Sequence, residues 1–388
     1  MLTIAQITLH TLGIGLTGLA LAHALLACFA ESRTVNRAPT PRSHDYDRGG
    51  VASIRCPRVT VLKPLCGDEP DLYRCLKSFC VQNYPQYQIV FGVQDPADVS
   101  LATAYRLQAE LPTQDIVVVI NPRVHGSNSK VSNLANILPA ARHRIVVAAD
   151  SDVMVDPDYL RRVTAPLADP TVGLVTSLYR ARPVGGVWSQ LVALFINEWF
   201  MPAVRVARSF GNVSFTSGVT IAMRRQTLEA LGGFEAFADV LADDYWLGER
   251  TRRLGLKTVT TERGVDTVVA EPNLGSACRH ELRWLRTIRS VQPRTYPPLG
   301  ITFTLPVATL GTLLAGADSV VLGLAAAAVV ARVLLNHLAR PARAPLWLVP
   351  VGDLLTFALW CWSFASRRVH WRTGVFAVQA DGSMQRTG

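Results

Sequence analysis

One stretch of this chain decides its fold: Ile145-Val146-Val147-Ala148-Ala149-Asp150-Ser151-Asp152. Its apolar, β-branched first half predicts a short buried strand. The strand carries two carboxylates, Asp150 and Asp152, to its carboxyl end, which is the edge where open α/β sheets bind ligands. Such oxygen ligands suit Mg²⁺ or Mn²⁺ and can hold the cation against a diphosphate. Alone, the motif also fits a polar turn with solvated acids, so its partners elsewhere in the chain decide between the two.

Strand and helix patterns alternate along the chain before and after this stretch. Strands are predicted at 59–62, 88–93 and 116–120, and helices at 71–80, 99–111 and beyond Lys130. This alternation predicts a largely parallel α/β sheet of the nucleotide-binding type. Asp95 follows the second strand as Asp150 follows the fourth, so both can face one nucleotide. Asp156 as N-cap and Pro157 at the first helical position predict the next helix.

The composition indicates a membrane protein. Only 18% of the 388 residues are charged, and the mean hydropathy of +0.22 is high for an ordinary soluble enzyme. The net charge of +10 fits either nucleic acid or anionic lipid, and the apolar segments favour lipid. The seven cysteines are scattered, without zinc-ligand spacing, which fits a reducing cytosol.

Hydropathy and charge together predict five regions. These are a transmembrane anchor at 1–30, a basic linker at 31–57, a catalytic α/β domain at 58–296, a membrane region at 297–370 and a cytosolic tail at 371–388. A cleaved signal is the alternative for the first region, but no Lys or Arg precedes Arg33, so an uncleaved anchor is favoured. The arginines of the linker place it, and the catalytic domain, in the cytosol.

The C-terminal apolar stretches leave the topology open. They run over 299–317, 319–336 and 345–366, the third broken by Pro350, Gly352 and Asp353. Three full spans would put the Arg-rich tail outside the cell, against the charge rule, and the loop from Arg340 to Arg343 also has a cytosolic composition. A re-entrant or interfacial third stretch would remove this conflict.

Three further segments carry candidate functional residues. The acids of Asp243-Asp244-Tyr245 begin a predicted helix, and His280-Glu281-Leu282-Arg283-Trp284 lies in another, with Arg279, Arg283 and Arg286 on one face. The segment 185–206 contains Trp188, Phe195 and Trp199 and is too interrupted to span a bilayer. It fits a core helix or an interfacial helix lying on the membrane.

Taken together, these motifs resemble those of a known enzyme family. Asp95, the Asp-x-Asp pair, Asp243-Asp244 and the His280–Trp284 motif resemble the D, DxD, ED/DD and Q/R-x-x-R-W motifs of processive-type inverting family 2 glycosyltransferases. The chain is more similar to family 21, the ceramide glucosyltransferases and bacterial hopanoid glycosyltransferases. The similarity extends to Leu62-Lys63-Pro64-Leu65, the Gly126–Lys130 loop and Trp371-Arg372-Thr373-Gly374. His280 stands where the family has Gln or Arg.

The resemblance implies a cytosolic GT-A domain with N-terminal and C-terminal transmembrane helices, a UDP-sugar donor, Mg²⁺ or Mn²⁺, and inversion at the anomeric carbon. It implies roles for individual residues: Asp244 as catalytic base; Asp152 and Asp150 at the metal; and Asp95, Asp150, Lys130, His280, Arg283 and Trp284 at the donor. The position of Asp244 at a helix N-terminus predicts that it stays ionised. The apolar segment 185–206 itself predicts Trp188, Phe195 and Trp199 as contacts of the lipid acceptor.

Simpler interpretations of these residues stay open. Asp244 fits an ordinary helix cap, Lys130 a solvated loop lysine, Arg283 a basic helix face on anionic headgroups, and Trp284 an interfacial anchor.

The predicted function is transfer of a hexosyl or N-acetylhexosaminyl group from a UDP-sugar to a membrane lipid. Ceramide and a hopanoid such as bacteriohopanetetrol both fit as acceptor, and the site is expected on a multi-pass protein of the bacterial inner membrane, with no nucleic-acid partner. The alternatives are an inactive membrane scaffold that keeps the sugar-nucleotide fold, and a polysaccharide synthase. A synthase needs a transmembrane channel, for which too few spans are predicted.

Overall fold

The structure, a computed structural model, describes residues 4–36, 56–316, 318–339, 344–366, 368–371, 374–378 and 382–386. Most of the predicted basic linker, the loop from Arg340 to Arg343, and Arg372 and Thr373 of the tail lie outside these ranges.

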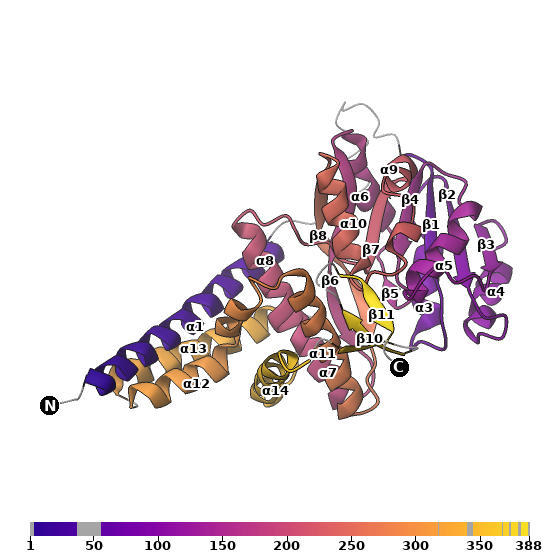
Figure 1. Cartoon of the computed structure of the whole chain (residues 1–388). Helices are drawn as coiled ribbons and strands as arrows, with labels where there is room; N and C mark the ends of the chain where they lie inside the picture. Colours follow the sequence, from indigo (N-terminus) through magenta and orange to yellow (C-terminus); the bar gives the residue numbers. More distant parts are fainter. Residues whose placement is uncertain are drawn as a thin grey trace. The chain divides into compact units, whose positions relative to one another are not determined.

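The chain forms two compact units (Figure 1). The α/β unit comprises Pro39–Arg180, Val213–Val269 and Phe376–Gly388, and the helical unit comprises Met1–Ala38, Ala181–Asn212 and Ala270–Val375. Residues 181–212 and 270–296, expected within the catalytic domain, therefore group with the helical unit.

The α/β unit is built on an eight-stranded mixed sheet of order β3-β2-β1-β4-β7-β6-β8-β5. Its strands are β1 Val59–Pro64, β2 Tyr87–Val93, β3 Asp115–Ile120, β4 Ile145–Ala149, β5 Val153–Met154, β6 Val172–Pro183, β7 Thr220–Arg224 and β8 Lys257–Val269. β1 to β4 are parallel, as predicted. β7 pairs antiparallel with β4 and β6, and β5 with β8, so the prediction of a largely parallel sheet holds for the first half only.

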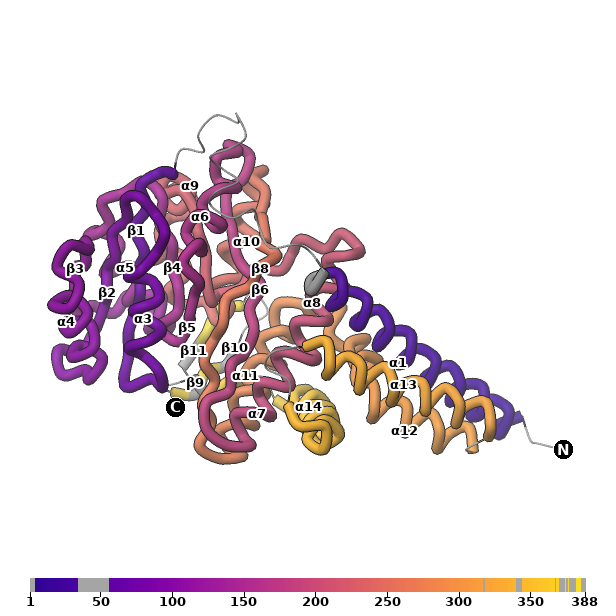
Figure 2. Tube along the Cα trace, turned by 180° about the vertical axis from the view of Figure 1, so that it is seen from behind, coloured from indigo at the N-terminus to yellow at the C-terminus, as the bar shows by residue number. Residues whose placement is uncertain are grey.

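Helices cover both faces of this sheet. They are α3 Leu72–Cys80, α4 Ser100–Glu110, α5 Ser129–Ile137, α6 Tyr159–Thr164, α9 Arg225–Ala230 and α10 Asp243–Arg253. α5, α9 and α10 share one hydrophobic cluster. Figure 2, seen from behind, shows α3 and α6 on the opposite face, where Phe79 meets Tyr159 edge to face at 5.4 Å. The predicted α/β class is confirmed.

The helix after the acidic stretch begins later than predicted. α6 starts at Tyr159, and Asp156 is not its cap. The Asp156 carboxylate instead accepts the N–H of Asp158 at 3.0 Å and pairs with both outer nitrogens of Arg162, at 2.7 and 2.5 Å. A guanidinium that takes both carboxylate oxygens holds Asp156 in the turn ahead of the helix.

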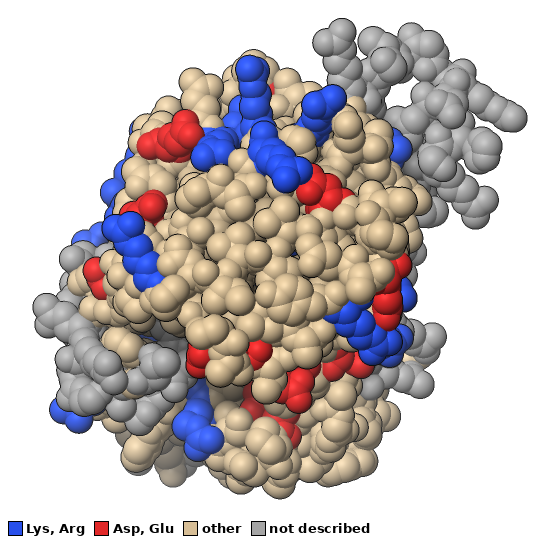
Figure 3. All heavy atoms as spheres, turned by 90° about the vertical axis from the view of Figure 1, so that its right-hand side faces the viewer, with Lys and Arg blue, Asp and Glu red and all other residues tan. Residues whose placement is uncertain are grey.

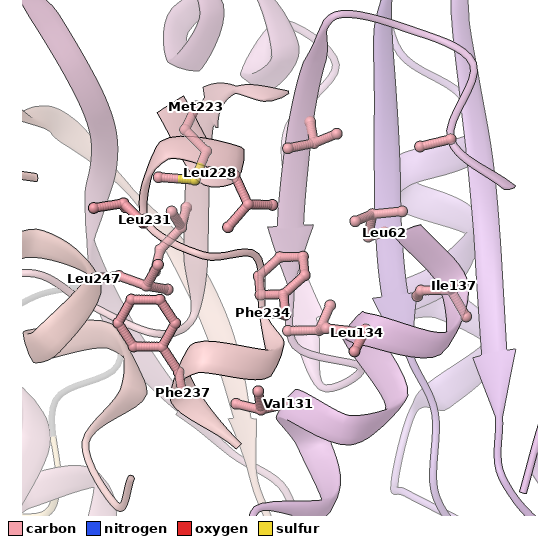
Figure 4. Close-up of a cluster of buried hydrophobic side chains, with 14 of the residues drawn as sticks. Leu62, Val131, Leu134, Ile137, Met223, Leu228, Leu231, Phe234, Phe237 and Leu247 are labelled. Atoms are coloured by element: carbon pink, nitrogen blue, oxygen red, sulfur yellow. The ribbon is translucent and has the colours of Figure 1, made fainter. Parts of the chain in front are cut away.

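Figure 4 shows the cluster that fixes α5 and α10 on the sheet. Its buried members include Leu62, Val131, Leu134, Ile137, Met223, Leu228, Phe234, Phe237 and Leu247. Burying one such side chain contributes about 1.5–3 kcal/mol. Gly92 lets α5 approach β2 closely, because a Cβ there would lie 2.3 Å from Ile137. The first turns of α5 and α10, which carry Lys130 and Asp244, are thereby anchored to the core.

The α/β unit exposes a mixed charge pattern on the face drawn in Figure 3. Basic side chains there are interspersed with acidic ones, which are most frequent toward one lower edge. The excess of ten positive charges over the whole chain is thus not concentrated on this face.

The helical unit draws on three separate parts of the chain. Its elements are α1 Ile4–Asn36, α7 Val187–Leu194, the π-helical turn Phe195–Phe200, α8 Met201–Ser209, α11 Leu274–Val291, the 3₁₀ turn Pro297–Thr302, α12 Thr304–Ala315, α13 Ser319–Leu338 and α14 Leu348–Ser363. α1 lies beside α12 and α13 (Figures 1 and 2). Glycines permit this, since a Cβ on Gly13 would lie 2.4 Å from the carbonyl oxygen of Gly311. A separate three-stranded sheet has the order β11-β10-β9, from β9 Arg368–Trp371, β10 Gly374–Val378 and β11 Met384–Arg386.

Two described helices are long and apolar enough to cross a membrane. They are Ile4–Arg33 and Ser319–Leu338, with mean hydropathy 1.9 and 2.0. α12 and α14 have 12 and 16 residues. At a rise of about 1.5 Å per residue, even α14 reaches only about 24 Å, against a hydrocarbon core of about 30 Å. The first and third predicted C-terminal stretches therefore form helices too short for a full perpendicular span.

Candidate active site

Asp150 and Asp152 lie in the turn at the carboxyl end of β4. An oxygen of Asp150 is 2.5 Å from the ammonium nitrogen of Lys130. Asp152 accepts a hydrogen bond from the hydroxyl of Thr267 on β8 at 3.0 Å. Between them, the hydroxyl of Ser151 bonds to Glu69. The turn is therefore braced from three different segments and is not a turn of solvated acids.

The electrostatics of this turn favour a bound cation. Burial, together with the negative charges of Asp150 and Glu69, raises the pKa of Asp152 to about 7. A cation would relieve that repulsion and restore the ionised form. No cluster of three or more His, Cys, Asp and Glu side chains suited to a metal occurs within the described ranges. Two carboxylates nevertheless fit Mg²⁺, which commonly takes one or two from the protein and completes its shell with phosphates and water.

Lys130 joins two of the predicted motifs. Besides its ion pair with Asp150, its ammonium donates to the backbone carbonyl of Gly218 at 3.1 Å. Burial opposes the charged form, yet Asp150, Asp243 and Asp244 hold the pKa of Lys130 well above its ordinary value. Lys130 is therefore a charged, mostly buried group and not a solvated loop lysine. Contact with a phosphate stays a prediction.

The loop that carries Lys130 is tied to the segment ahead of α10. The Asn128 side chain caps α5 through the N–H of Val131 at 3.0 Å and donates to the carbonyl of Val240 at 3.1 Å and to Asp243 at 3.3 Å. A Cβ on Gly126 would lie 2.6 Å from the carbonyl oxygen of Ala238. In this Gly-x-Asn-x-Lys motif, Gly126 allows the loop to lie close to Ala238, Asn128 caps α5, and Lys130 forms the ion pair with Asp150.

Asp244 lies in the first turn of α10 and faces the same network. One carboxylate oxygen accepts the N–H of Gly218 and the other that of Tyr245, each at 2.8 Å. The position at a helix N-terminus predicts a fully ionised Asp244. Burial and the neighbouring Asp243 instead raise its pKa to about 6, although Lys130 and the two N–H groups oppose them. The carboxylate is still mostly ionised at pH 7 and has the near-neutral pKa that suits a general base.

Asp95 is exposed in the turn after β2. One oxygen accepts the N–H of Ala97 in its own turn at 2.8 Å. β1 separates β2 from β4 in the sheet, so Asp95 shares the ligand edge with Asp150 at a distance of two strands. Its contact with uridine stays a prediction.

Lys63, the last but one residue of β1, lies in the Leu62–Leu65 motif, for which the sequence predicted no role at the site. Its buried ammonium donates to the carbonyl of Asp150 and lies 3.9 Å from the centre of the Phe79 ring. Burial lowers the pKa of Lys63 to about 8, against the attraction of nearby acids. A lysine at the end of an apolar strand was the available signal, because such a charge must find a buried partner.

The residues predicted from the second half of the family motif belong to the helical unit. Trp284 on α11 packs edge to face against Phe200 and Phe195, at 5.3 and 5.9 Å between ring centres. Phe195 stacks on Trp199 at 5.2 Å, and the Trp199 N–H donates to Thr302 at 2.8 Å. Phe195, Trp199 and Trp284 therefore form one aromatic cluster. A lipid that reached Phe195 or Trp199 would have to replace protein contacts.

Two other predicted residues lie apart from that cluster. Trp188 packs against an apolar group that includes Leu191 and Leu348. Arg286 is buried and donates to the carbonyl of Arg368 at 2.5 Å, while Arg279 is exposed. The three arginines, expected on one helix face, therefore do not form one solvent-exposed basic surface, because Arg286 is buried.

The helical unit also contains a buried ionic network that the sequence did not predict. Arg332 donates to Glu198 at 2.6 Å and to Asp353 at 2.8 Å, and Asn336 donates to Glu198 at 2.8 Å. Glu198, Arg332 and Asp353 border a cavity of about 20 Å³ beside Trp199. That volume admits a water molecule but no lipid. A single arginine in an apolar helix was the signal, since such charges pair inside a protein.

Comparison with known proteins places this geometry in a family. The model of glycosyl transferase family 21 matches residues 16–384. Ceramide glucosyltransferase 1 of Caenorhabditis elegans is 24% identical over 238 residues, which are 61% of this chain and 51% of that protein. Ceramide glucosyltransferase of Candida albicans is 32% identical over 152 residues, 36% and 28% of the two chains. The chain thus spans about half or less of these curated relatives.

Two further proteins show similarity. An N-acetylglucosaminyltransferase of Rhizobium leguminosarum bv. viciae is 22% identical over 275 residues, 68% of this chain and 63% of that protein. A mannosyltransferase from Pyrobaculum calidifontis, solved with GDP-Man and Mn²⁺, aligns over 91% of this chain and 99% of its own, at 22% identity and a TM-score of 0.49. The family match covers most of the sequence, and this chain belongs to glycosyl transferase family 21.

Proposed function

We propose that this chain transfers a hexosyl or N-acetylhexosaminyl group from a UDP-sugar to the hydroxyl of a membrane lipid, with inversion at the anomeric carbon. One observation carries the proposal: Lys130 links the carboxylate of Asp150 to Gly218, whose N–H holds Asp244. Three motifs that are far apart in the sequence thereby meet in one acidic network at the ligand edge of the sheet.

Asp244 is the base in this proposal. Its carboxylate takes the proton of the lipid hydroxyl while the hydroxyl oxygen attacks the anomeric carbon from the face opposite the leaving group. The bond from that carbon to the UDP oxygen breaks, and UDP leaves with the electron pair. The pKa of about 6 leaves Asp244 able to accept a proton at neutral pH. The N–H groups of Gly218 and Tyr245 hold the carboxylate in a fixed orientation.

Asp150 and Asp152 are the proposed ligands of Mg²⁺ or Mn²⁺. A divalent cation, when bound, stabilises the charge that develops on the diphosphate. Lys130 is placed to contribute a second positive charge beside Asp150. By resemblance, Asp95 holds the uridine end, and His280, Arg283 and Trp284 hold the diphosphate or the acceptor.

A lipid acceptor is supported by the two long apolar helices and by the relatives named ceramide glucosyltransferase. Because one relative is named N-acetylglucosaminyltransferase, we propose UDP-N-acetylglucosamine as well as UDP-glucose as a candidate donor. Ceramide and bacteriohopanetetrol are therefore both acceptors to test. We place the protein in the bacterial inner membrane as a multi-pass protein with its catalytic residues on the cytosolic side.

The test uses the full chain purified in detergent. Each UDP-sugar is combined with ceramide or bacteriohopanetetrol, and the product and its anomeric configuration are identified by mass spectrometry and NMR. We expect one β-linked glycolipid from an α-linked donor. Glu229→Gln, a change at an exposed carboxylate on α9, serves as the matched control for Asp244→Asn. UDP-sugar binding without transfer to any lipid would favour the inactive scaffold, and a polymer product would favour a synthase.

A further inference from the structure

Glu271 and His280 form a hydrogen-bonded pair at the start of α11. An oxygen of Glu271 is 2.7 Å from the Nδ1 atom of His280, and the other oxygen accepts from the hydroxyl of Ser276. The backbone N–H of Glu271 donates to the buried hydroxyl of Ser189 at 2.8 Å. The Glu271 side chain is only 8% exposed. Glu271 is thus held on three sides and presents a fixed oxygen to the imidazole.

The chemistry of this pair sets the tautomer of His280. Burial works against the charged carboxylate, but bonds from His280 and Ser276 keep the pKa of Glu271 below its ordinary value. An ionised carboxylate only accepts hydrogen bonds, so Nδ1 carries the proton. Burial lowers the pKa of His280, so the ring is neutral at pH 7. Nε2 is therefore left with a lone pair.

That lone pair has no partner within the described chain. Nε2 of His280 is buried and makes no hydrogen bond there. Buried polar atoms are normally paired, so an orphaned one requires an explanation. His280 belongs to the family motif and its ring lies 5.7 Å from that of Trp284, where the resemblance places ligand contacts.

We propose that Glu271 is a positioning residue that fixes His280 with Nε2 as an acceptor, and that this atom receives a hydrogen bond from a substrate hydroxyl. The hydroxyl belongs either to the sugar of the donor or to the lipid. This inference rests on the proposed function for the existence of such substrates. It narrows the contact expected of His280 with the sugar nucleotide, because a neutral ring with Nδ1–H has no proton on Nε2 to donate to a phosphate oxygen.

A double-mutant cycle tests the positioning role. Glu271→Gln removes the charge and lets the side-chain amide face Nδ1 with either its oxygen or its NH2 group, so the tautomer of His280 is no longer fixed. We expect this change to lower kcat/KM roughly 10–100-fold, as loss of a partner that orients a histidine typically does. His280→Gln restores the residue type of the family, whose amide both donates and accepts without a tautomer. Glu271→Gln added to His280→Gln should therefore cost no more than about twofold.

The two KM values distinguish the source of the hydroxyl. A rise confined to the UDP-sugar assigns it to the donor, and a rise confined to the lipid assigns it to the acceptor. Glu229→Gln is the control for loss of a carboxylate, and each melting temperature reports folding. If Glu271→Gln caused an equal loss in the wild type and in the His280→Gln variant, Glu271 would be merely structural and the proposal would be overturned.

Histidine ¹⁵N NMR of the full chain in lipid tests the tautomer without turnover. Loss of one signal in His280→Gln identifies His280 among the eight histidines. We expect a proton on Nδ1 and a lone pair on Nε2, with the Nε2 signal shifting when UDP-glucose or the lipid is added. A proton on Nε2, or no shift with either substrate, contradicts the inference. If wild type glycosylates no lipid, the proposed function fails, whereas the tautomer result still decides how Glu271 orients His280.

Discussion

The two units bury charge in opposite ways. In the α/β unit, one lysine faces Asp150, Asp243 and Asp244, and burial together with a neighbouring carboxylate raises the pKa of Asp243 and that of Asp244. In the helical unit, Arg332 divides its donors between Glu198 and Asp353, and Asn336 completes the bonds of Glu198. The first network has three carboxylates for one lysine, which forms its ion pair with Asp150. The second has two carboxylates for one arginine, and both are hydrogen-bonded to it. The difference teaches that a ligand site is recognised by a larger excess of negative charge, not by buried charge alone.

Removing the proposed divalent metal ion should affect the two networks most differently. An excess of EDTA should abolish turnover, and Mg²⁺ or Mn²⁺ should restore it, because Asp150 and Asp152 would hold the cation against the diphosphate. Turnover of purified protein in detergent is the measurement. The melting temperature should hardly change without substrate, since the carboxylates of the helical network are bonded to Arg332. Full activity in excess chelator would contradict the metal assignment.

Asp244→Asn should lower kcat by about 10²–10⁴-fold, the usual contribution of a positioned base. UDP binding, measured by calorimetry, should stay within a few-fold of wild type, because the amide keeps the shape of the side chain. A collapse of UDP affinity would make Asp244 a donor ligand.

Arg332→Met should lower the stability of the protein, whereas Asp244→Asn should lower its kcat. Removing the guanidinium leaves Glu198 and Asp353 buried without their cation, a loss of about 3–5 kcal/mol. Thermal unfolding in detergent measures it. Arg106→Met is the control, because its partner Glu110 is a surface acid on the same helix and exposed pairs of this kind contribute little to stability. Equal melting temperatures for the two variants would refute the structural role of the Arg332 network.

Trp199→Phe should have the smallest effect of these changes, and it tests whether Trp199 contributes to lipid binding. It removes the bond to Thr302, whose net contribution is about 0.5–1.5 kcal/mol, and keeps a ring against Phe195. We expect a few-fold rise in KM for the lipid and no change in KM for the UDP-sugar. Equal changes in both values would show that Trp199 is only core packing.

Sequence patterns predicted β1 to β4 and the helices between them because each element's signal is local. The antiparallel addition of β7 could not be predicted, since the chain reaches it through residues 184–219, which carry no pattern that orients a strand. Asp150, Lys130 and Asp244 were identified as candidates, and their contacts through Gly218 were not. Glu271 and Lys63 were missed because their roles depend on partners supplied by the fold.

The elevated pKa of Asp244 is the least local property of the site. Helix position alone predicts a fully ionised carboxylate, whereas burial and Asp243 outweigh the helix N-terminus. Neither burial nor the approach of Lys130 can be inferred from the three residues Asp243-Asp244-Tyr245. A tertiary property of this kind becomes visible only when the core holds α5 and α10 in place.

The pH dependence of kcat/KM tests most directly the claim that the acidic network supplies the base. Asp244 must be deprotonated to act, so activity should be full above its pKa and should fall below it. With a pKa of about 6, we expect an acid limb centred near that pH, dropping about tenfold for each further pH unit. Lys130→Gln should move the limb to higher pH, because Lys130 lowers the pKa of Asp244. A rate that stays level down to about pH 4.5, or a limb that Lys130→Gln leaves in place, would contradict the account.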